Sequence, residues 1–247
     1  MKKLIPLLCL MAGFSQPAAA GDFSALNLLT AADFKTLSED FGSAMSYKAV
    51  TPTAPLGGGL IPIGIDIGIE ATSTDISKSG AILKTATNGS VDIKSMIIPK
   101  FHVAVGFPFG IDVAAFTSVI PSTSIKLTGG ELRVALLKGG VAYPSVGIRG
   151  AMTRMSGVDE LSFDTKSLDI SISKGFLMLT PYAGVGQVWV NSKANVAGAA
   201  GAVLNESFTQ SKAFVGANLN LGLTNFALEG DKTGGTTSYS FKMGFRW

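Results

Sequence analysis

The single histidine of the chain, His102, is the residue best suited to move a proton. It alternates with apolar residues in segment 101–107, which places it on the polar face of a predicted strand. Asp112 follows a short turn at residues 107–110, so in a simple hairpin it would be a near neighbour able to orient the imidazole. A hydrolase also needs a nucleophile, and no serine follows His102 within two positions. We therefore predict an interior hydrogen-bonded pair and no enzyme, with a hydrolase that uses His102 as the lesser alternative.

Charged side chains of both signs occupy alternate positions in several apolar segments, so each would lie on the polar face of its strand. In a closed barrel that face lines the interior. There, opposite charges either set up a field across a water-filled passage or pair and fill the space. The candidate lining residues, besides His102, are Asp66, Glu70, Asp112, Glu131, Arg133, Arg149, Asp169, Glu229, Lys242 and Arg246.

The chain offers no group of residues that would hold a metal or a cofactor. One histidine and one cysteine, Cys9, cannot supply a ligand cluster. The glycines at 57–59 are followed by neither a lysine nor a helix pattern, so they do not form a phosphate-binding loop. We expect no cofactor and no metal.

Residues 1–20 have the pattern of a signal peptide. Lys2 and Lys3 precede an apolar run at 4–14, and small residues end the segment at Ala20. Removing the segment lowers the formal charge from +3 to +1 and removes Cys9. A nearly neutral chain without cysteine excludes disulfides and argues against a nucleic-acid partner.

Residues 21–59 follow a different pattern from the rest. Thr30 is a plausible helix N-cap with Asp33 three positions on, and Phe34, Leu37 and Phe41 recur at helical spacing. We predict a short amphipathic helix at residues 31–40 and then a Pro/Gly-rich connector at 51–59. This part is expected outside the barrel wall, as a periplasmic element or inside the lumen.

From residue 60 onward the apolar period is two. The odd positions from 61 to 69 are all isoleucine, whereas the even positions are small, acidic or proline. Ten such segments begin near residues 60, 96, 111, 124, 143, 162, 180, 209, 224 and 237, separated by tight turns that alternate with longer loops. Even strand numbers and this alternation are typical of transmembrane barrels. We predict an all-β, antiparallel, up-and-down transmembrane barrel of about 10 strands at residues 60–247, or of 12 if residues 22–50 supply two.

The final segment carries a family resemblance. In residues 239–247 every odd position is aromatic or methionine, and every even position is small or basic. This resembles the C-terminal signal of Gram-negative outer-membrane β-barrels, although the usual last residue there is phenylalanine. The resemblance implies outer-membrane lipid, the barrel-assembly machinery and periplasmic chaperones as partners. The assembly-signal residues would be Phe241, Met243, Phe245 and Trp247.

The order of signal peptide, short helix, connector and small barrel resembles uncharacterised outer-membrane proteins. It is loosely similar to fatty-acid transporters with an N-terminal plug, whose barrels are larger. A ten-stranded interior is narrow, which favours a mostly closed lumen. Inward glycines nevertheless leave space for a ligand, for water or for the N-terminal segment: Gly64, Gly68, Gly106, Gly147, Gly216 and Gly244.

Two functions therefore stay open from the sequence. The first is a small channel or transporter-like barrel for small or apolar solutes, and the alternative is a structural or adhesive barrel that acts through its extracellular loops.

An interfacial girdle of aromatic side chains is also expected for a membrane barrel, formed by Tyr143, Tyr182, Trp189, Tyr239 and Trp247.

Overall fold

A computed structural model describes residues 23–57, 63–121, 123–140 and 142–247. The predicted signal peptide and residues 58–59 of the connector lie outside these ranges. Among the described helices, none is long and apolar enough to cross a membrane.

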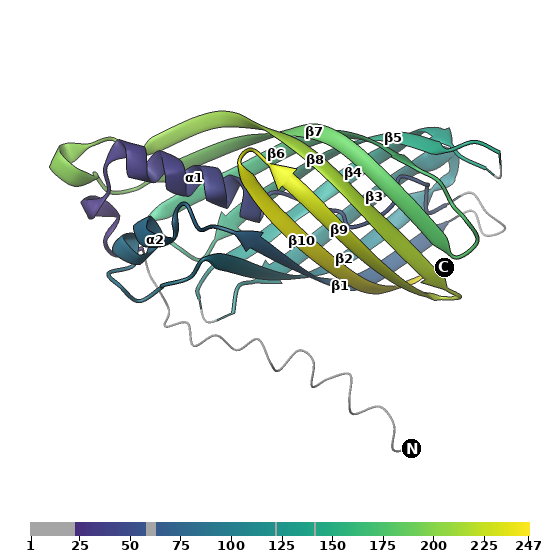
Figure 1. Cartoon of the computed structure of the whole chain (residues 1–247), viewed down its shortest axis with the longest axis horizontal. Coiled ribbons are helices and arrows are strands. Elements are labelled where there is room, and N and C mark those ends of the chain that lie inside the picture. Colours follow the sequence, from purple (N-terminus) through teal and green to yellow (C-terminus); the bar gives the residue numbers. More distant parts are fainter. Residues whose placement is uncertain (1–22, 58–62, 122, 141) are drawn as a thin grey trace, which may run out of the picture.

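Ten antiparallel strands form a closed barrel in which every strand pairs with its neighbour in the sequence and β1 pairs with β10 (Figure 1). The predicted fold class is confirmed, and the predicted strand starts lie within four residues of the observed ones. The twelve-strand alternative is wrong, because residues 23–57 add no strand to the wall. The strands are Gly64–Asp75 (β1), Ser95–Phe107 (β2), Ile111–Val119 (β3), Lys126–Lys138 (β4), Ser145–Ser156 (β5), Leu161–Ser173 (β6), Leu179–Ala194 (β7), Asn205–Leu221 (β8), Thr224–Thr233 (β9) and Thr236–Arg246 (β10).

The two ends of the barrel differ. We call the end where β1 begins and β10 finishes the turn end, since tight connections such as the 3-10 turn Pro108–Gly110 (η3) lie there. The other end, the loop end, carries two longer connections with their own helices. A seven-residue helix, Gly80–Ala86 (α2), lies between β1 and β2, and a 3-10 turn, Ala199–Gly201 (η4), lies between β7 and β8. The sequence did not predict α2, which is short and has no side-chain hydrogen bond at its N-cap.

The N-terminal helix is longer than predicted and lies at the loop end (Figure 1). After a 3-10 turn at Leu26–Leu28 (η2), helix α1 spans Ala31–Met45, five residues beyond the expected end at Asp40. Phe41, Ala44 and Met45 are buried, so packing inside the barrel stabilises a last turn that sequence periodicity alone did not favour.

The start of α1 is a complete capping box. The Asp33 amide donates to the Thr30 Oγ1 at 3.1 Å, and the Thr30 amide donates to the Asp33 carboxylate at 3.1 Å. We expect Thr30→Ala to lower the free energy of unfolding by about 1 kcal/mol, because a helix donor loses its partner. Urea titration in detergent micelles measures this. Thr36→Ala, in the middle of the same helix, is the control and should change stability less; an equal loss in both variants would contradict a specific capping role.

From Met45 the chain continues through the lumen toward the turn end. We call residues 31–57 the lumenal segment. The Ser38 hydroxyl donates to Ser192 at 3.0 Å near the loop end, and the Leu56 amide donates to Asp112 at 3.2 Å near the turn end. Inward glycines make this path possible. A Cβ on Gly147 would lie 2.8 Å from Thr53 Cγ2, and one on Gly64 would lie 2.1 Å from the Leu56 carbonyl oxygen. The N-terminal segment therefore occupies space that the glycines leave.

The inner face of the barrel changes character along the strands. Toward the turn end it is polar and charged, whereas toward the loop end it joins the helices in one apolar cluster, which we call the outer core. In the outer core the Phe41 ring meets Phe23 and Phe163 edge-on, with centroids 6.0 and 6.3 Å apart. Its other members include Leu26, Leu29, Phe34, Leu37, Met45, Ile76, Leu83, Met96, Ile98, Ile120, Ile125, Leu127, Met155, Leu161, Val188, Val190 and Leu204.

The outer face changes in the opposite sense. Toward the turn end it is a band of exposed apolar side chains, among them Ile69, Phe101, Val113, Leu132, Ile148, Leu168, Ile170, Val185, Val215, Leu228, Phe241 and Phe245. Toward the loop end the outward positions are mostly polar, as with Ser73 on β1, Arg154 on β5, Lys166 on β6 and Lys232 on β9. Of the predicted aromatic girdle, Tyr143, Trp189, Tyr239 and Trp247 are exposed. The prediction for Tyr182 is wrong: it faces inward and is buried against Phe214.

Candidate functional site in the barrel lumen

The densest group of charges in the lumen centres on Asp66 of β1. His102 Nε2 lies 3.1 Å from Asp66 Oδ1, and Lys242 Nζ lies 3.0 Å from Asp66 Oδ2. Arg246 Nε donates to the same Oδ2 at 2.8 Å. One buried carboxylate is thus the shared partner of groups from both neighbouring strands, β2 and β10. We call Asp66, Glu70, Lys100, His102, Lys242 and Arg246 the Asp66 cluster.

Glu70 completes the cluster one step toward the loop end. His102 Nδ1 lies 2.9 Å from Glu70 Oε1, and Lys100 forms an ion pair with the other oxygen of Glu70. The strand register explains the bridge. His102 stands opposite Gly68, midway between Asp66 and Glu70, and a Cβ on Gly68 would lie 2.7 Å from the imidazole Cε1. The missing side chain at Gly68 gives the ring its place between two carboxylates.

The predicted neighbour of His102 is therefore wrong. In the β2–β3 hairpin, Asp112 stands opposite Gly106 and His102 opposite Phe116, because the tight turn fixes the register. Asp112 instead accepts a hydrogen bond from Arg133 Nε at 3.0 Å. The carboxylates that orient His102 come from β1, which pairs with β2 on its other side.

A second group lies where the lumenal segment approaches the turn end. Arg133, besides its bond to Asp112, donates from Nη1 to the Pro52 carbonyl at 2.6 Å. The Thr53 hydroxyl lies 2.5 Å from the Ser171 hydroxyl, and the Ala54 amide donates to Ser173 at 3.2 Å. Arg246 Nη2 also donates to the Thr51 hydroxyl at 2.9 Å. Wall side chains thus hold the extended part of the lumenal segment through polar contacts.

The third group lies on the opposite wall. Arg149 Nη2 lies 3.1 Å from Asp169 Oδ2, and Arg149 Nε lies 3.6 Å from Glu131. Lys212 shares Asp169 at 3.5 Å and donates to the Tyr47 carbonyl at 3.0 Å. Glu229 is also buried on the inner wall, but no ion pair among the described residues reaches it.

The structure places all eleven lining candidates on the inner face, and every one except the partly exposed Arg246 is buried. Sequence reasoning missed Lys100, Lys212 and Asp231, although their even or odd strand positions put them on the same face. It also missed Lys48, which lies 3.6 Å from Asp231 and belongs to the lumenal segment. No strand period could have found Lys48, because that residue lies outside the wall.

The lining is close to neutral as a whole. Buried acids and bases alternate in space, so that most charges have a partner of opposite sign within hydrogen-bond or ion-pair distance. In the described part of the chain, no group of three or more His, Cys, Asp or Glu side chains has the arrangement of a metal site. These contacts match the ion-paired alternative of the sequence analysis, in which the charges fill the interior.

Fold and lining together define the class of protein: a closed ten-stranded antiparallel barrel with an apolar outer band and an interior occupied by its own chain. The solved structures to which it is similar are small outer-membrane barrels. The KdgM porin in complex with disordered oligogalacturonate has a TM-score of 0.38 at 9% identity, over 73% of this chain and 98% of that chain.

Two further structures give similar values. The N-terminal β-barrel domain of Pseudomonas aeruginosa OprF has a TM-score of 0.35 at 13% identity, over 74% of this chain and 97% of that chain. The outer membrane protease OmpT from Escherichia coli has a TM-score of 0.34 at 8% identity, over 75% and 96%. No protein-family model matches the chain, and no curated protein matches its sequence. These weak similarities carry no conclusion about activity, which has to come from the molecule itself.

Proposed function

We propose that this protein is an integral outer-membrane barrel that is closed by its own N-terminal segment and acts through the surface it presents beyond the membrane. The reversal of polarity along the strands supports the membrane placement. Near the turn end the wall is apolar outside and charged inside, as in a barrel surrounded by lipid. Near the loop end it is polar outside and apolar inside, as in a protein surrounded by water.

The observation that carries the proposal is the course of the lumenal segment. Its helix packs into the outer core with Phe34, Leu37 and Phe41 each about 1% exposed. Its extended part makes polar contacts with four different strands down to Asp112. The segment therefore fills the lumen at both ends, and the outer core, the loops and α2 form one folded unit above the apolar band. Such a unit suits a structural or adhesive role.

A channel or transporter is the second candidate, favoured by one feature. The stretch from Thr51 to Leu56 has no regular structure and is held by hydrogen bonds and not by an apolar core. Solutes could pass there only if this stretch moved. A hydrolase has less support, since both ring nitrogens of His102 face carboxylates and no serine hydroxyl among the described residues bonds to the ring.

Planar-bilayer recordings separate the two candidates. We expect the full-length protein to show no stable ion conductance, because the lumenal segment blocks the passage. The variant Thr53→Cys/Ser171→Cys ties this segment to the wall when oxidised, since the two hydroxyls lie 2.5 Å apart. It should be silent in both redox states.

The matched control is Thr72→Cys/Ser240→Cys, which joins β1 to β10 where the hydroxyls lie 2.8 Å apart and leaves the lumenal segment untied. The proposal of a blocked lumen would be overturned by a stable conductance in the wild-type protein that the first variant loses on oxidation and regains on reduction, and that the control variant keeps in both redox states. That result would establish the gated channel instead.

A further inference from the structure

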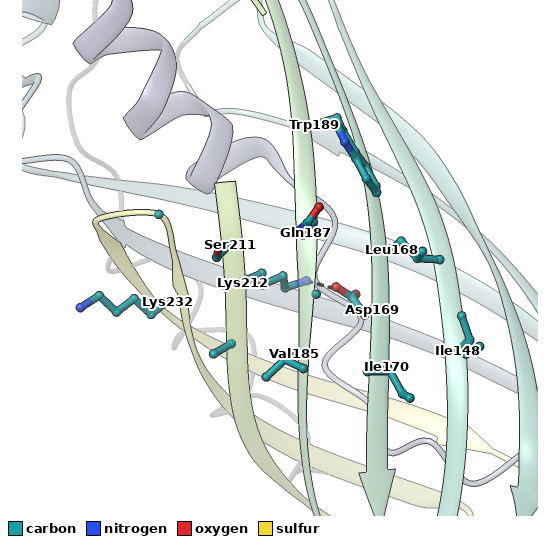
Figure 2. Close-up of a pocket in the computed structure, with 13 residues that line it drawn as sticks. Ile148, Leu168, Asp169, Ile170, Val185, Gln187, Trp189, Ser211, Lys212 and Lys232 are labelled. Atoms are coloured by element: carbon teal, nitrogen blue, oxygen red, sulfur yellow. Dashed lines mark hydrogen bonds and ion pairs between the residues drawn. The ribbon is translucent and has the colours of Figure 1, made fainter. Parts of the chain in front are cut away.

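The outer wall of the barrel carries a depression of about 730 Å³ across β5 to β9, which we call the wall groove (Figure 2). Its sides are apolar side chains that point away from the barrel: Ile148, Leu168, Ile170, Val185 and Trp189. Its floor is β8, whose outward residues there, Ser211 and Ala213, are small and leave the depression open. The groove opens on the outward side of the wall. Asp169 and Lys212 also line it, but their side chains are fully buried on the inner side and pair with each other at 3.5 Å.

The groove has a polarity gradient along its length. Toward the turn end it is lined by Ile148, Ile170 and Val185 in the apolar band. Toward the loop end it is bordered by Gln187, Ser211 and the indole of Trp189. A ligand that fits must therefore be apolar along one part and polar at the end nearest the loops.

Positive charge stands on both sides of the polar end. Lys232 of β9 lines one edge of the groove, and Lys166 of β6 stands directly opposite Trp189 on the other side. Both side chains are exposed, and neither has an ion-pair partner among the described residues. Asp164, the next outward residue on β6, is paired with Arg154 at 2.9 Å, so it does not neutralise Lys166.

We propose that the wall groove binds a phosphorylated glycolipid of the outer membrane leaflet, with an acyl chain between Val185 and Leu168 and phosphates at Lys166 and Lys232. Acyl chains fill apolar wall depressions without displacing water, and lysines at the membrane surface attract anionic head groups. Two lysines on opposite sides of one groove suit a head group with two separated phosphates better than one with a single phosphate. The inference rests on the proposed outer-membrane placement.

The test uses the full chain in phosphatidylcholine nanodiscs with diphosphoryl lipid A as the probe, and native mass spectrometry as the measurement. We expect saturable binding by the wild-type protein and about tenfold weaker binding by Lys166→Gln/Lys232→Gln. Ala213→Phe, which fills the groove floor, should weaken binding independently of charge. Monophosphoryl lipid A should bind less tightly than the diphosphoryl form.

Matched controls are Lys126→Gln on β4 and Ala115→Phe on β3, which are outward, exposed positions on another part of the wall. Equal weakening by the control variants would overturn the proposal, since it would show a general attraction to the barrel surface. So would phosphatidylglycerol binding as tightly as lipid A. Failure of the barrel to insert into nanodiscs would instead contradict the membrane placement itself, so the two failures are distinguishable.

Discussion

Asp66→Asn should lower the free energy of unfolding by about 3–5 kcal/mol, the largest effect we expect from a single polar substitution. The change keeps the shape of the side chain and removes only its charge. Lys242, Arg246 and His102 all meet this carboxylate, and Lys242 has just 1% of its side chain exposed. Without Asp66 these groups lose the anion that compensates their removal from water.

Urea titration in detergent micelles, followed by tryptophan fluorescence, measures this loss. Asp164→Asn is the matched control. Its partner Arg154 has 77% of its side chain exposed, so the surface ion pair should contribute no more than about 1 kcal/mol. Equal effects of the two substitutions would contradict a structural role for the Asp66 cluster.

A double-mutant cycle extends the test. Lys242→Met removes a buried cation, and in combination with Asp66→Asn it should cost less than the sum of the two single changes, because each single change leaves a partner uncompensated. Strict additivity would show that Asp66 and Lys242 do not interact in the folded barrel.

Phe41→Ala should lower the free energy of unfolding by about 3–5 kcal/mol, because it opens a cavity where α1 meets the barrel wall. The ring is 1% exposed and contacts Phe23 and Phe163, which come from the N-terminal turn and from β6. The substitution therefore tests whether the helix is part of the folded barrel interior.

The control lies in the same N-terminal part. Leu28 in η2 is 57% exposed, so Leu28→Ala should change stability by no more than about 0.5 kcal/mol. The same urea titration compares the two variants. A loss for Phe41→Ala no larger than that for Leu28→Ala would mean that α1 does not pack in the lumen. It would remove the main support for a lumen that the N-terminal segment blocks.

The sequence predicted which face of its strand each charged residue occupies, but it did not predict which side chains of different strands contact each other. Alternation places Asp66, Glu70 and His102 on one face regardless of distant structure, since a strand turns each successive side chain to the opposite side. The partners of His102, in contrast, depend on the register in which β2 pairs with β1. The predicted partner, Asp112, was a neighbour in sequence, whereas Asp66 and Glu70 are neighbours only in the pairing of β1 with β2.

The sequence alone was enough to predict the approximate starts of the ten strands after residue 60 and the inward direction of the charged side chains, because both follow from a local period of two. That residues 23–57 add no further strand was settled only by the structure. The capped start of α1 also followed from local sequence, because Thr30 and Asp33 stand at the spacing of a capping box. Only the tertiary structure decided where residues 31–57 lie. Their place depends on the space left by glycines at 64, 106 and 147 and on bonds to Arg133, Ser171 and Asp112, which come together only when the barrel closes.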